Sequence, residues 1–170
     1  MSFFLYLLKI TQKMKSKINS FFLIAFGFFT IMMITQSCEK EDEGCDEESI
    51  SYIGGDESHN EGQNCMQCHK DGGEGEGCFV IAATVYDSLQ VNTITSGKVD
   101  FYTEPNGLGQ KIKTVEIDSK GNFFTTDMFD LQGLYPVVTG PTGNKKYMGS
   151  ALTTGQCNSC HTPGNRIWVN

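Results

Sequence analysis

The sequence predicts a mainly β protein: a small antiparallel β-sandwich with a Cys-x-x-Cys-His segment on either side of it. Short runs rich in β-branched and aromatic residues recur through the middle of the chain, and clusters of glycine, proline and asparagine separate them. After residue 38 no stretch shows the apolar period of a useful amphipathic helix. We therefore expect one domain over residues 58–170, with the sandwich core over residues 79–150.

Five strands are expected in this core. They cover residues 79–86, 98–103, 111–118, 122–126 and 134–139. Turn signals lie between them at Glu104-Pro-Asn-Gly107, Ser119-Lys-Gly-Asn122 and Gly140-Pro-Thr-Gly143. The flanking segments, residues 58–78 and 151–170, hold the two Cys-x-x-Cys-His motifs in loops.

The order of the strand motifs is similar to that of the carboxypeptidase regulatory-like, or transthyretin-like, β-sandwich. The likeness consists of Ala83-Thr-Val-Tyr-Asp87, then Val99-Asp-Phe-Tyr102, then Ile117-Asp-Ser-Lys-Gly-Asn-Phe123. Ala83 stands where that family commonly has Gly, and Ile117 where Thr is common. The resemblance implies a scaffold or binding module and brings no catalytic residues with it.

The start of the chain predicts export. Lysines without acids precede a short apolar run over residues 21–34, an order typical of a secretory signal rather than of a membrane span. Thr35-Gln-Ser-Cys38 resembles the lipobox of bacterial lipoproteins, so we expect residues 1–37 to be removed and Cys38 to carry lipid. An uncleaved membrane anchor is the alternative.

Residues 38–57 are expected to form an acidic tether. Their run Glu39-Lys-Glu-Asp-Glu43 is either a solvated linker or, by resemblance to a Gram-negative sorting signal, an address for the outer face of the outer membrane. Without residues 1–37 the chain keeps nine basic and twenty acidic residues, a net charge of −11. This charge argues against nucleic-acid binding and favours basic protein partners.

Seven cysteines divide into three groups. Cys38 is assigned to lipid, while Cys45 and Cys78 could form one disulfide or remain two free thiols. The other four lie in two motifs of equal spacing, the first motif Cys65-Met-Gln-Cys68-His69 and the second motif Cys157-Asn-Ser-Cys160-His161.

This spacing is the attachment motif of c-type haem. Each thiol bonds one vinyl group of the porphyrin, two intervening residues let one turn of chain reach both vinyls, and the next histidine binds the iron. We therefore expect two haem c groups, anchored by Cys65, Cys68, Cys157 and Cys160 and bound by His69 and His161. One zinc ion held by the four thiols, or a pair of simple disulfides, are the alternatives.

The second axial position of each iron has fewer candidates. His59, the one remaining histidine, is the candidate for one haem, and a surface histidine is the alternative. Met148 is the better candidate for the other haem, ahead of Met66 and Met128, and a vacant position is also open. Arg166 could pair with a haem propionate or lie on the surface.

These features predict an electron carrier of the cell envelope with redox proteins as partners. The chain also resembles small exported di-haem proteins that start Ser-His-Asn-x-Gly-x-Asn-Cys-x-x-Cys-His and end Cys-Asn-x-Cys-His, a likeness that implies no firm activity. The alternatives are an exported, zinc-stabilised binding module and a di-haem enzyme such as a peroxidase. The enzyme is less favoured, because the chain does not clearly supply an acid–base partner.

Overall fold

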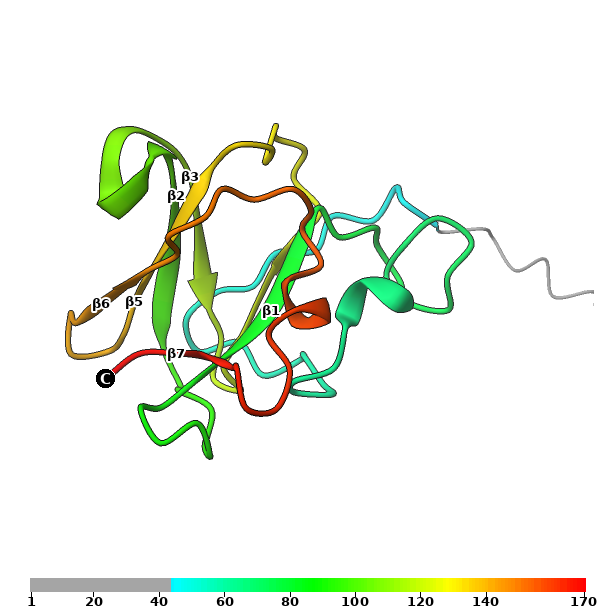
Figure 1. Ribbon diagram of the computed structural model, residues 1–170. Helices are drawn as coiled ribbons and strands as arrows, with labels where there is room; N and C mark the ends of the chain where they lie inside the picture. The colour runs from blue at the N-terminus through cyan, green and yellow to red at the C-terminus, as the bar shows by residue number, and fades with distance from the viewer. Residues whose placement is uncertain (1–43) are drawn as a thin grey trace, which may run out of the picture. The chain divides into compact units, whose positions relative to one another are not determined.

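The computed structural model describes residues 44–170, so the expected signal segment 1–37, the lipid site Cys38 and the acidic run 39–43 lie outside the described residues. Seven strands of this part form two sheets (Figure 1). The smaller sheet has the order β4-β1-β7, with β1 (Ile81–Tyr86), β4 (Asn122–Thr125) and β7 (Ile167–Trp168). The larger sheet has the order β3-β2-β5-β6, with β2 (Gly97–Glu104), β3 (Leu108–Ile117), β5 (Tyr135–Thr139) and β6 (Lys145–Tyr147).

The predicted mainly β sandwich is confirmed. All strand neighbours are antiparallel except β1 and β7, which run parallel. The helical elements of the described part are three 3₁₀ turns, η1 (Cys65–Gln67), η2 (Pro105–Gly107) and η3 (Cys157–Ser159). Across residues 44–170 no helix has the length and apolarity that crossing a membrane would require.

The core lies between the two sheets. Ile81, Ala83 and Val85 of β1 pack there with residues of the larger sheet that include Val99 and Phe101. All six residues of β1 are buried, so this strand lacks the alternation of a half-exposed strand. Its burial pattern shows that the outer face of the small sheet is also covered. The segments that carry the two cysteine motifs cover this face.

Two short strands were not predicted from the sequence. Strand β6 is exposed along its whole length and extends the larger sheet beside β5. Strand β7 has two residues, Ile167 and Trp168, paired with Val85 and Tyr86. Neither strand has a hydrophobic period long enough to detect in a sequence. Their pairing comes from the neighbouring strand instead.

The structure also differs from the expected tether over the part of it that is described. Residues 44–57 lie against the domain instead of standing free in solvent. Ser51 is buried, and its amide donates to the carbonyl of Phe124 over 3.0 Å. Ile50 forms a β-bridge with Thr125, and a disulfide joins Cys45 to Cys78. This acidic segment therefore lies on the domain near the first motif.

Candidate functional site

Both motifs form the same local structure. In each, the first cysteine begins a 3₁₀ turn, and the histidine amide closes it by donating to that cysteine's carbonyl. The distance is 3.0 Å from His69 to Cys65 and 2.9 Å from His161 to Cys157. This bond places each histidine directly after the turn that its first cysteine begins. The two thiols and the imidazole of each motif line one cavity.

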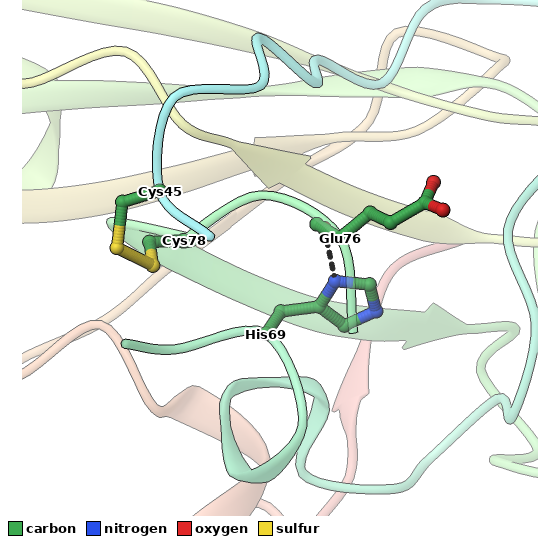
Figure 2. Close-up of a disulfide and its surroundings, with 4 residues drawn as sticks. All are labelled: Cys45, His69, Glu76 and Cys78. Atoms are coloured by element: carbon green, nitrogen blue, oxygen red, sulfur yellow. Dashed lines mark hydrogen bonds between the residues drawn. A yellow bond between two sulfur atoms is a disulfide. The ribbon is translucent and has the colours of Figure 1, made fainter. Parts of the chain in front are cut away.

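The two imidazoles are also oriented in the same way. The Nδ1 atom of His69 lies 2.7 Å from the carbonyl oxygen of Glu76 (Figure 2), and Nδ1 of His161 lies 2.9 Å from that of Asn165. A carbonyl oxygen only accepts hydrogen bonds, so Nδ1 carries the proton in both rings. Nε2 then keeps a free lone pair. Metal-binding histidines are commonly oriented by such a hydrogen bond on the other ring nitrogen.

A glycine-rich loop makes the bond to His69 possible. The chain turns back over the imidazole between Lys70 and Gly77, and a Cβ placed on Gly75 would lie 2.8 Å from the ring. A Cβ on Gly73 would lie 1.9 Å from the carbonyl oxygen of Cys68. The disulfide between Cys45 and Cys78 holds the end of this loop (Figure 2). The glycines thus allow the loop to wrap closely around His69.

The first motif borders a cavity of about 540 Å³, here called the first cavity. Cys65, Cys68 and His69 line it, together with Phe79 and Phe124. The ring of Phe79 stacks on His69 at 4.1 Å between centroids. This contact fixes the plane of the imidazole and supplies an apolar wall.

His59 lies on the first cavity as well. Its ring centroid is 5.8 Å from that of His69. It is exposed and comes from the loop before the first motif. The candidate second ligand and the candidate proximal ligand thus line one space.

The second motif borders a separate cavity of about 610 Å³, here called the second cavity. Its walls are mainly apolar and include Phe101, Met148 and Trp168 beside Cys157 and His161. Met148, the candidate axial ligand of the second haem, thus lines the cavity beside the second motif. Met128 is 87% exposed, and neither it nor Met66 lines either cavity.

Arg166 lines the second cavity but already has partners there. Its Nη1 donates to the carbonyl of Gln90 over 2.6 Å, and its guanidinium stacks on the ring of Tyr86 at 4.3 Å. The remaining guanidinium N–H groups are the ones that could reach a propionate.

The two motifs are joined to each other through side-chain amides. Asn158, inside the second motif, donates from Nδ2 to the carbonyl of Gln63 over 2.7 Å. Its Oδ1 accepts from the amide of Thr84 in β1 at 3.3 Å. Nearby, Asn64 donates to Gln156 over 3.0 Å. Segments that are 92 residues apart in the chain are therefore direct neighbours on the outer face of β1.

Asn158 is a site residue that the sequence analysis missed. It is 5% exposed, and its amide connects both motifs with the sheet. In the sequence it stands between the two cysteines, where haem attachment itself needs no particular residue. Only the contacts of the folded chain show that it is fixed.

Asn158→Ala is expected to lower the free energy of unfolding by about 1–3 kcal/mol, because the Thr84 amide and the Gln63 carbonyl lose a buried partner. Chemical denaturation measures the change. Ser159→Ala, at an exposed position in the same turn, serves as the control and should cost less than about 0.5 kcal/mol. Equal losses in the two variants would show that the amide contacts contribute nothing specific.

The thiols of the two motifs differ in their surroundings. Burial, together with the nearby thiols of Cys160 and Cys65, raises the pKa of Cys157 to about 12. Burial also raises the pKa of Cys65. The second cysteines, Cys68 and Cys160, are exposed. The first thiol of each motif is therefore neutral at ordinary pH and lines its cavity.

The four thiols line two cavities and do not meet at one point. Within residues 44–170 no three or more His, Cys, Asp or Glu side chains are grouped so that they could hold a metal ion by themselves. The arrangement instead presents, twice, two thiols and one imidazole beside an open cavity. No family model matches this chain, and neither the curated proteins nor the solved structures contain a match to it.

Proposed function

We propose that this protein is a one-electron carrier with two covalently bound c-type haems, one in each cavity. The observation that carries the proposal is the repeated geometry of the motifs: a turn whose two thiols and following imidazole line one cavity, with Nδ1 of the imidazole bonded to a backbone carbonyl. A zinc site or a disulfide would not need the histidine in this position. Two independent segments of the chain build the same arrangement.

The cavities fit the group in size and in chemistry. Volumes of about 540 and 610 Å³ lie within the range of small-molecule and cofactor sites. Cys65 and Cys68 would form the thioethers in the first cavity, and Cys157 and Cys160 in the second. His69 and His161 would supply the proximal nitrogen. When bound, the haem supplies reversible one-electron chemistry at iron.

The chain's own residues would fix the position and the surroundings of each haem. The carbonyls of Glu76 and Asn165 orient the two imidazoles and increase their basicity. Phe79 and Trp168 supply apolar surface to the two cavities and would reduce the contact of each haem with water. Asn158 and the bond between Asn64 and Gln156 hold the sites next to each other, which favours electron exchange between them.

His59 is proposed as the second ligand of the first haem and Met148 as that of the second. Arg166 is proposed to pair with a propionate in the second cavity. Lipid on Cys38 after removal of residues 1–37 would tether the carrier to the outer membrane, where redox proteins of the envelope would be its partners.

His59→Ala is expected to change the visible spectrum of the loaded protein, since one iron would lose a strong-field ligand. The change should affect one of the two haems of each chain. A reduced-minus-oxidised difference spectrum measures it. Glu61→Ala, in the same exposed loop, is the matched control. A spectrum that His59→Ala leaves unaltered would remove His59 from the ligand set.

The proposed function is tested by dissolving the protein, produced in a host that attaches c-type haem, in alkaline pyridine. The reduced spectrum should show thioether-linked haem at two per chain, the number of motifs in the sequence. A colourless protein that instead contains zinc would contradict the proposal.

A further inference from the structure

The charges around the two cavities have opposite sign. Glu47, Glu57 and Glu76 line the first cavity, which has no lysine or arginine in its wall. Lys146 and Arg166 line the second cavity, which has no acidic residue in its wall.

The surrounding segments have the same bias. Residues 44–76, which contain the first motif, have nine acidic residues and one lysine. Residues 131–170, which contain the second motif, have three basic residues and no acid. The strongly negative charge of the chain is therefore concentrated at one site and absent from the other.

We propose that this asymmetry gives the two haems unequal reduction potentials, so that electrons enter at the first site and leave from the second. The inference rests on the proposed function. Oxidation adds one positive charge to iron. Negative side chains around the first cavity stabilise the oxidised iron and lower its potential, and positive side chains around the second stabilise the reduced iron and raise its potential.

The transfer moves a single electron. The first iron is oxidised from ferrous to ferric, and the second is reduced from ferric to ferrous. A one-electron donor protein with a basic surface, attracted to the acidic side, would restore the first iron. A one-electron acceptor protein would reoxidise the second.

The candidate axial ligands bias the potentials in the same direction. A methionine ligand raises the potential of a haem relative to a second histidine. His59 lines the first cavity and Met148 the second.

Lys146 is the residue best suited to test the second site. Its ammonium lies 3.3 Å from the centre of the Trp168 ring, on the cavity side of β6. Lys145, the preceding residue of the same exposed strand, points to the opposite face of the sheet. Lys145→Gln is therefore a matched control for Lys146→Gln. For the first site, Glu57→Gln is matched by Glu104→Gln, an exposed glutamate at the end of β2 and outside both cavities.

The experiment is a spectroelectrochemical titration of the haem-loaded protein. Two separate one-electron steps are expected. Lys146→Gln should lower only the higher potential, and Glu57→Gln should raise only the lower one. Each should reduce the equilibrium constant for electron transfer from the first to the second site by about two- to tenfold, the effect of removing one charge on the order of 10 Å away. Each control variant should change this equilibrium constant less. Added salt should reduce the difference between the two reduction potentials.

Cys65→Ser combined with Cys68→Ser assigns the steps, because the haem that remains should titrate at the higher potential. If two haems are present but the remaining one titrates at the lower potential, or if the Lys146 and Glu57 variants behave as their controls, the inference is overturned while the proposed function stands. A protein without haem overturns both. The glutamine variants keep the test informative if the cysteine variant fails to fold.

Discussion

Chains in which both Cys157 and Cys160 are replaced by serine are expected to carry one covalently bound haem instead of two. Serine keeps the shape of the turn but cannot form a thioether with a vinyl group. The same loss is expected when Cys65 and Cys68 are replaced, since each motif borders its own cavity. Haem per chain, measured after denaturation that removes non-covalent haem, should therefore fall by about half.

The other cysteine pair provides the control for this experiment. Replacing Cys45 and Cys78 by serine removes the disulfide but none of the four anchor thiols. These chains should be less stable, by about 2–4 kcal/mol for a disulfide that closes a loop of this kind. They should still hold two haems. A halved haem content in this control as well would mean that haem attachment depends on the stability of the fold and not on the cysteines of the motifs.

Gly155→Ala is expected to have a large effect on stability. A Cβ at this position would lie 1.9 Å from the carbonyl oxygen of Val80 and 2.8 Å from Cα of Ile81. Both neighbours are backbone atoms of or beside β1, which is buried on its two faces, and neither can move without opening the sheet. We expect a loss of about 3 kcal/mol or more, with poor loading of the second motif two residues later.

Gly149→Ala is the matched control, because nothing lies within 4 Å of a Cβ built there. It should change the free energy of unfolding by no more than about 1 kcal/mol. Thermal or denaturant unfolding of both variants measures the difference. A Gly155→Ala protein as stable as the control would show that the second motif does not pack on β1 as described.

The strand pattern of the sandwich was predictable because its core strands are rich in β-branched and aromatic residues between turn signals. The runs predicted over 79–86, 98–103 and 122–126 became β1, β2 and β4 with small shifts at their ends. The edge strand β6 and the two-residue β7 were missed, since their pairing depends on a neighbour and not on their own composition.

The residues of the candidate site could be listed from the sequence, but their arrangement could not. Cysteine spacing predicts the anchors and the proximal histidines, which remain predictions, and the structure places His59 and Met148 on the walls of the cavities beside the two motifs. No pattern in the sequence shows that Asn158 connects the motifs.

Residues 38–57 were expected to form a tether because of their acidic composition. That expectation could not include the bond from Ser51 to Phe124 or the disulfide that hold this segment on the domain. Contacts between residues far apart in the chain account for each of these differences.

The central claim is that both motifs carry haem, and mass spectrometry of proteolytic fragments tests it most directly. The fragment with Cys65 to His69 and the fragment with Cys157 to His161 should each be heavier than its sequence by the mass of one haem. Both fragments at their unmodified masses, in protein from a host that attaches c-type haem, would contradict the account.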